Sequence, residues 1–106
     1  MQRILFIFLS FILSLSIYAQ EFGRADSLRG YLFPERSCYD VTYYHLSLNI
    51  NPEKKFIKGF NEIHFTAKDD FSIIQIDLFE NMKINRIEFQ KENLDFHRDY
   101  NAVFIN

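Results

Sequence analysis

The chain has 106 residues, a formal net charge of −2 and a single cysteine. This length allows one domain at most. The charge is too mild to imply a nucleic acid or an acidic membrane surface as partner, and one cysteine excludes an internal disulfide.

Residues 1–19 have the order of a secretory signal peptide. Arg3 is the only charge before Glu21, residues 4–17 are apolar except for serines, and Ala19 is a small residue suited to cleavage. The apolar run is shorter than the roughly 20 residues that span a bilayer. We predict cleavage after Ala19, export to the periplasm or the medium, and no membrane attachment afterwards. An uncleaved anchor or a buried helix are the alternatives.

Residues 20–38 are predicted to be a lead-in segment. Residues 24–29 fit one helical turn that Gly30 ends, and we expect Pro34 to keep the residues after it extended. Cys38 closes this segment. We expect its thiol to be part-buried and inert, with a reactive or intermolecular thiol as the alternative.

A long hairpin is predicted next. Residues 39–51 alternate with period two, which is typical of a strand with one buried face. The side chains expected on that face are Tyr44, Leu46, Leu48 and Ile50. Residues 51–55 form a charged turn around Pro52. Residues 56–67 form the return strand, whose odd-numbered residues are expected to be buried because Lys58, Glu62 and His64 occupy the other face.

Four shorter strands follow in the predicted fold. They cover residues 72–78, with Ile74, Ile76 and Leu78 facing inward, residues 83–90, with a bulge, and the final hairpin of 94–98 and 102–105. No helix of any length is expected. The prediction is an all-β fold with an antiparallel sheet, an incomplete saddle-shaped sandwich over residues 39–106. Since the last strand runs to the end of the sequence, we expect it to pair with strands beyond Asn106.

The three histidines do not have the short spacing typical of a zinc site. Closing the first hairpin at residues 51–55 is expected to place His45 near Asn61 and His64 near Thr42. We therefore interpret His45, His64 and His97 as solvent-side residues. A metal site is the less favoured alternative.

Other polar and aromatic groups also have simple structural explanations. Asp69 and Asp70 are adjacent on a turn, where their carboxylates diverge instead of facing one bond. The lysines at the first turn are a solubilising tip. The aromatic residues of the hairpin favour core packing and cross-strand pairing, with a sugar- or strand-stacking face as the alternative. These residues are Tyr39, Tyr43, Tyr44, Phe56 and Phe60.

Several motifs in order resemble the start of one enzyme family. Tyr44-His-Leu-Ser-Leu48 is followed by the turn Asn51-Pro-Glu-Lys-Lys55 and by Ile57-Lys-Gly59. Similar segments continue at 76–84 and 101–105, and the lead-in at 24–30 and 34–36 also fits. Together these segments resemble the N-terminal β-domain of the aminopeptidase N family of zinc metallopeptidases, in its secreted bacterial form.

The resemblance implies a β-domain that abuts a catalytic domain, and no chemistry in this chain. In that family the zinc ligands lie in a later domain that carries H-E-x-x-H and a Gly-x-Met-Glu-Asn segment, and neither motif occurs here. We therefore predict no catalytic, cofactor-binding or metal-binding residue in this chain, with zinc expected only in that later domain. The function predicted is the N-terminal fragment of an exported aminopeptidase, inactive alone. A stand-alone secreted β-sandwich binding module is the alternative.

Overall fold

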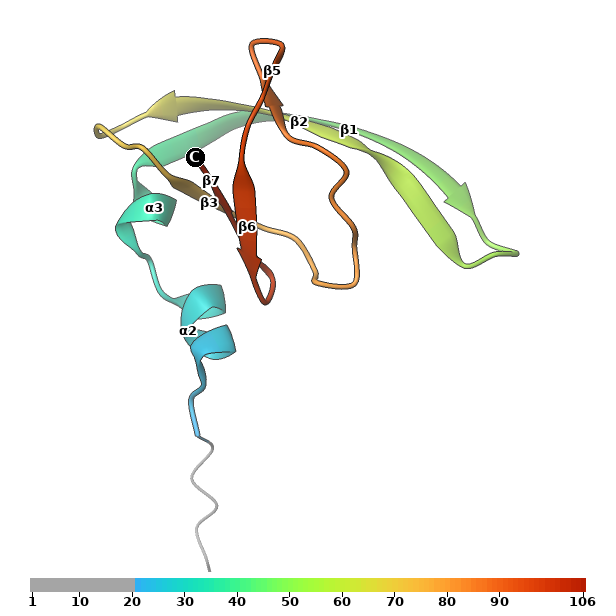
Figure 1. The fold of residues 1–106 in the computed structure, drawn as a ribbon, viewed down its shortest axis with the longest axis horizontal. Helices are drawn as coiled ribbons and strands as arrows, with labels where there is room; N and C mark the ends of the chain where they lie inside the picture. The colour runs from blue at the N-terminus through green and yellow to red at the C-terminus, as the bar shows by residue number, and fades with distance from the viewer. Residues whose placement is uncertain (1–20) are drawn as a thin grey trace, which may run out of the picture.

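The computed structural model describes residues 21–106, so the predicted signal peptide lies outside the described residues. Figure 1 shows a long curved hairpin arching over shorter strands, with two short helices at one end. The elements are α2 (Arg24–Gly30), α3 (Pro34–Ser37), β1 (Tyr39–Asn51), β2 (Phe56–Ala67), β3 (Ile74–Asp77), β4 (Glu88–Phe89), β5 (Glu92–Asn93), β6 (Phe96–Asp99) and β7 (Ala102–Ile105). All strand pairings among the described residues are antiparallel, which confirms the predicted all-β fold.

The β1–β2 hairpin forms where the period-two pattern predicts it. Its turn is fixed locally, because the Asn51 side-chain oxygen accepts a hydrogen bond of 2.9 Å from the backbone N–H of Lys54. Lys55 then takes a left-handed backbone conformation with φ of 50°. Farther along, Gly59 allows the strands to approach closely, since a Cβ atom there would overlap the backbone oxygen of Ser47.

The hairpin register differs by one residue from the prediction. The closing pair is Asn51 with Phe56, so His45 faces Glu62 instead of Asn61. In the same register His64 faces Tyr43, and a bulge at Thr42 shifts the pairing only from Val41 toward the start of β1. The Thr42 hydroxyl still donates a hydrogen bond to the backbone oxygen of His64, 3.2 Å away. The two faces of the hairpin are composed as predicted. From Tyr43 to Asn51, each even-numbered residue of β1 pairs with an odd-numbered residue of β2, and paired residues share a face.

The second sheet has the order β3–β7–β6 and holds most of the described core. β7 is its central strand, with Val103 fully buried. The prediction that β7 pairs with strands beyond Asn106 is therefore wrong, since β3 and β6 already occupy both of its edges. The predicted turn between β6 and β7 is confirmed, with Tyr100 at φ of 54°.

The inward residue of β3 is Gln75, which is fully buried, whereas the predicted Ile74 and Ile76 are half-buried. Its side-chain nitrogen donates to the backbone oxygen of Leu28 and to Asp77, each at 3.2 Å. The nitrogen of this buried amide is thereby paired, as buried polar groups usually are, and the Leu28 oxygen also accepts a hydrogen bond from Arg36.

The lead-in segment packs on β3 through polar contacts. The predicted helical turn before Gly30 is present as α2, but the expectation of an extended chain after Pro34 is wrong. Pro34 occupies the first turn of α3, where its missing N–H costs nothing. Arg36 of α3 forms an ion pair with Asp77 of β3 and donates to the backbone oxygen of Arg29, 2.9 Å away.

The predicted strand at residues 83–90 is reduced to the two residues of β4, and the structure adds β5 as its partner. Gln90 and Lys91 both have positive φ, 51° and 72°, and this pair folds the chain back into a tight turn. The chain between β3 and β4 forms a loop whose first part is held by the Arg98 guanidinium, which donates hydrogen bonds to three backbone oxygens. The acceptors are the backbone oxygens of Leu78, Phe79 and Met82. No helix within residues 21–106 has the length and apolar character to cross a bilayer.

Candidate functional site

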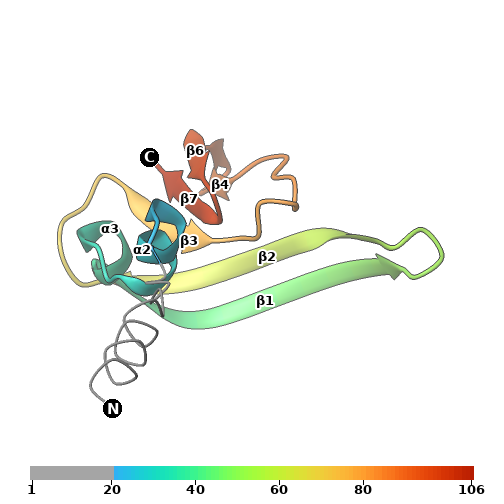
Figure 2. The same ribbon diagram turned by 90° about the horizontal axis from the view of Figure 1, so that it is seen from below.

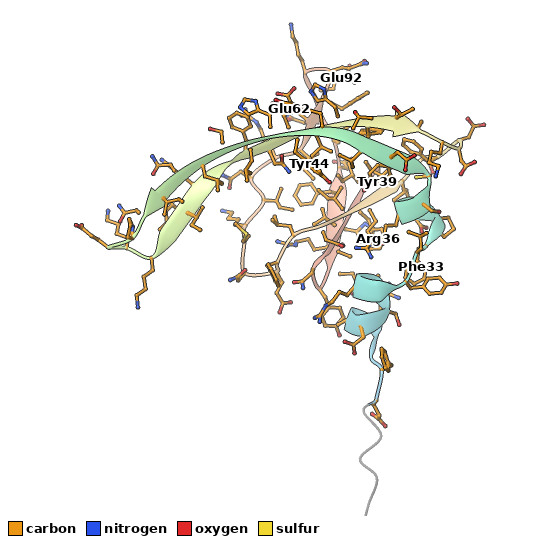
Figure 3. The ribbon with its side chains drawn as sticks, turned by 180° about the vertical axis from the view of Figure 1, so that it is seen from behind. Phe33, Arg36, Tyr39, Tyr44, Glu62 and Glu92 are labelled. Atoms are coloured by element: carbon orange, nitrogen blue, oxygen red, sulfur yellow. The ribbon has the colours of Figure 1, made fainter. Side chains whose placement is uncertain are left out.

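The inner face of the β1–β2 hairpin carries apolar side chains that remain exposed. Figure 3 shows Tyr39 and Tyr44 beneath the arch of the hairpin and Glu62 above it. Tyr44 and Leu46 are each 59 % exposed to solvent, even with the second sheet and the helices in place. The predicted burial of this face is therefore wrong for most of β1, and only Ile63 and Phe65 of β2 are half-buried. A two-stranded ribbon has no second layer of its own to cover such a face.

The outer face gathers two of the three histidines around one carboxylate. His64 Nε2 lies 2.5 Å from Glu62 Oε1, and His45 Nδ1 lies 4.0 Å from Glu62 Oε2. This proximity arises because His45 is directly opposite Glu62, while His64 is two residues farther along the same strand face. All three side chains are more than half exposed. Both histidines are on the solvent side, as predicted, but their shared contact with Glu62 was not predicted from the sequence.

The electrostatics of this cluster are those of an open surface. The hydrogen bond from His64, and then the positive charge of the two imidazoles, lower the pKa of the exposed Glu62 carboxylate below its ordinary value of 4.5. Among residues 21–106 no set of three or more His, Cys, Asp or Glu side chains has the arrangement of a metal centre. The cluster can exchange protons with water and pair with a charged partner. It has no enclosing pocket in which to hold a reacting bond.

The aromatic residues of the hairpin divide between its two faces. On the outer face Tyr43 packs edge-on against His64, with ring centroids 5.1 Å apart, and His45 packs against Phe60 at 5.6 Å. Tyr39 instead points inward and donates a 2.6 Å hydrogen bond to the backbone oxygen of β3 residue Gln75. Burial raises the pKa of the Tyr39 phenol. Cross-strand pairing accounts for the outer rings, as predicted, and no single stacking platform collects all five aromatics.

Two hollows adjoin these elements. A shallow one of about 500 Å³ lies beside Gly59 and is lined in part by Ser47, Lys58 and Asn85. A more apolar one of about 250 Å³ lies between α2 and the end of β3, with Leu28 and Phe79 among its walls. The second hollow is also lined by Arg29 and Asp77, and Asp77 is already paired with Arg36.

The other residues considered in the sequence lie apart from the histidine cluster. His97 stacks on Phe104 in the second sheet, with ring centroids 4.9 Å apart. Asp69 and Asp70 are exposed on the turn after β2, and Lys54 and Lys55 are exposed at the hairpin tip. Cys38 is 5 % exposed, and burial raises the pKa of its thiol. This burial fits the prediction of an inert thiol.

Comparison of the chain with protein families, with curated proteins and with solved structures found no match. The geometry of the described residues is therefore the basis for the function proposed below.

Proposed function

We propose that residues 39–106 are the opening part of an N-terminal β-domain from an exported zinc aminopeptidase of the aminopeptidase N type. The observation that carries this proposal is the exposed apolar inner face of β1–β2. A ribbon with Leu46, Leu48 and Ile50 in water needs another protein layer against it, because contiguous exposed apolar surface marks an interaction site.

The motifs of the family resemblance have physical roles in this structure. Asn51 caps the hairpin turn through its side chain, and Gly59 permits the close approach of the two strands. The Tyr44-to-Leu48 motif supplies the inner apolar face. These roles support a shared hairpin architecture, because the local backbone accounts for Asn51 and Gly59.

In this proposal the chain is a scaffold and not a catalyst. Its partner is the catalytic metallopeptidase domain, which would hold the zinc and remove N-terminal residues from peptides. The described residues would contribute the β-layer that abuts that domain. The histidine cluster around Glu62 lies on the opposite, outer face and has no part in this contact.

An activity assay tests the catalytic part of the proposal. The purified protein should not hydrolyse amino-acyl anilides, with or without added zinc. Turnover that co-purifies with the chain and is abolished by a chelator would refute the scaffold role. The Gly59→Val variant, in which the hairpin is disrupted, is the control for a contaminating peptidase. Activity of the chain itself should fall in this variant, whereas activity of a contaminant should not change.

The origin of the chain is tested by the DNA that follows the codon for Asn106. A reading frame there that encodes H-E-x-x-H within a few hundred codons supports the proposed relationship. Downstream DNA that lacks such a frame in any register counts against it.

A stand-alone secreted binding module is the second candidate, favoured by the exposed aromatic pairs of the outer face. Tyr43 and Phe60 are 54 % and 57 % exposed and flank the Glu62 carboxylate. Aromatic faces next to hydrogen-bonding groups suit sugar rings or peptides. Saturable binding to a glycan or peptide array, lost in Tyr43→Ala but retained in Tyr31→Ala, would favour this candidate over the scaffold role.

A further inference from the structure

The outer edge of β1 is a long unpaired strand edge. β1 runs for 13 residues, and within the described part of the chain it pairs with β2 alone. Figure 2 shows β1 on the side of the hairpin that faces away from β3, β6 and β7. Its outward N–H and C=O groups can therefore accept another extended strand without displacing any described element.

This edge has little of the protection that proteins give to exposed strands. Between Thr42 and Asn51 it has no proline, glycine, lysine, arginine or acidic residue. β2, in contrast, carries Lys58, Gly59 and Glu62 within its length, which disfavour further pairing on its side. The β1 edge is thus the one suited to strand addition.

The two ends of the hairpin have opposite charge. The tip presents Lys54 and Lys55, and Lys58 follows, against Glu53 alone. The base presents Asp40, Asp69 and Asp70, and the one lysine there, Lys68, is 3.7 Å from Asp40. An antiparallel copy of the same strand places the basic tip of each hairpin beside the acidic base of the other, so the charges attract at both ends.

We propose that β1 is a self-association edge, and that its occupant is β1 of a second copy of this chain. The pairing is antiparallel about Ser47, which faces its own copy on the two-fold axis. Leu46 then faces Leu48 of the partner subunit, and Tyr44 faces Ile50 of the partner subunit. The two hairpins form one four-stranded sheet.

This register satisfies three separate requirements. It keeps the apolar side chains of both copies on one face, since facing residues in an antiparallel pair share a side of the sheet. It brings Asp40 beside the turn that carries Lys54 of the partner subunit. It also ends at the bulge of Thr42, so the paired segments run from Tyr43 to Asn51 and then stop. The two-fold symmetry closes the assembly as a dimer.

Cysteine cross-linking tests the pairing at the two-fold axis. Facing Cα atoms in an antiparallel pair are about 4.5–5.5 Å apart, which a disulfide spans. The protein is produced from its full sequence, with Cys38→Ser as the parent. Ser47→Cys in that parent should form a disulfide-linked dimer roughly tenfold faster than Asn61→Cys, whose copies are about 16 Å apart across three strand spacings and two residues of offset. Equal rates, or a parent that sediments as a monomer at micromolar concentrations, would overturn the proposal.

Charge reversal tests the register. Asp40→Lys alone, or Lys54→Asp alone, should weaken dimerisation roughly tenfold by placing like charges together at both ends. The double variant Asp40→Lys/Lys54→Asp should restore it, which a loss of folding cannot do. Sedimentation velocity reads both effects. If the double variant does not restore dimerisation, or if a series of larger oligomers forms in place of a dimer, the closed pairing about Ser47 is refuted.

Discussion

The contact between Arg36 and the end of α2 gives the sharpest stability prediction. The Arg36 side chain is 21 % exposed, forms an ion pair with Asp77, and donates to the backbone oxygens of Arg29 and Leu28 at 2.9 and 3.3 Å. Hydrogen bonds to a charged group contribute about 1.5–3 kcal/mol each. The three contacts share one side chain and Asp77 is partly exposed, so they do not add fully. Arg36→Ala should therefore lower the free energy of opening α2 by about 2–3 kcal/mol.

Hydrogen exchange measures this opening directly. A change of about 2 kcal/mol raises the exchange rate of the α2 amides roughly 30-fold, because each 1.4 kcal/mol is a factor of ten. The amide of Tyr31, which bonds to the oxygen of Ser27 at 2.9 Å, is a suitable probe. Arg29→Ala is the matched control, since it removes the same charge from an exposed position. Similar exchange in both variants would show that Arg36 does not hold the helix.

Three further predictions concern single side chains. Gly59→Ala should abolish hydrogen-exchange protection across the β1–β2 hairpin, because its Cβ would overlap backbone, whereas Gly30→Ala, with open space around it, should have little effect. The pKa of Glu62, followed by NMR, should lie below 4.5 and rise in His64→Gln. Since this folded-state pKa is lowered, the contact stabilises the hairpin above that pH and is lost as the pH falls through it. Cys38 should resist alkylation until denaturant unfolds the chain, because its thiol is buried and its pKa is raised; rapid native-state labelling would contradict this.

The sequence predicted the hairpins well because their signals are local. Alternation from Tyr44 to Ile50 and the turn after Asn51 need no knowledge of the rest of the chain. The same holds for the final hairpin, where Tyr100 turns the chain. Which face is buried is a different question, since it depends on what packs against the strand. The inner face of β1 shows this, because it is apolar in sequence and exposed among the described residues.

Long-range contacts account for the remaining errors. Gln75 is buried because the oxygen of Leu28 lies within its reach, and nothing near it in sequence indicates that contact. Most of the strand predicted at 83–90 is absent, and the chain just before it is held in a loop by hydrogen bonds from Arg98 to the backbone oxygens of Leu78, Phe79 and Met82. The Glu62 cluster could have been found, since Glu62 and His64 share a strand face by simple alternation. Placing His45 beside them required the correct closing pair of the turn, Asn51 with Phe56.

The central position of β7 has a consequence for the order in which the chain folds during synthesis. β3 leaves the ribosome well before β7, the strand that pairs with it, so β3 has no sheet to join until Ile105 has been made. The β6–β7 hairpin closes locally and quickly, and β3 then closes a long loop onto it. Gln75 and Asp77 become fixed only at that step. Among the described elements, the helices α2 and α3 that these two residues hold are therefore synthesised first and fixed in place last.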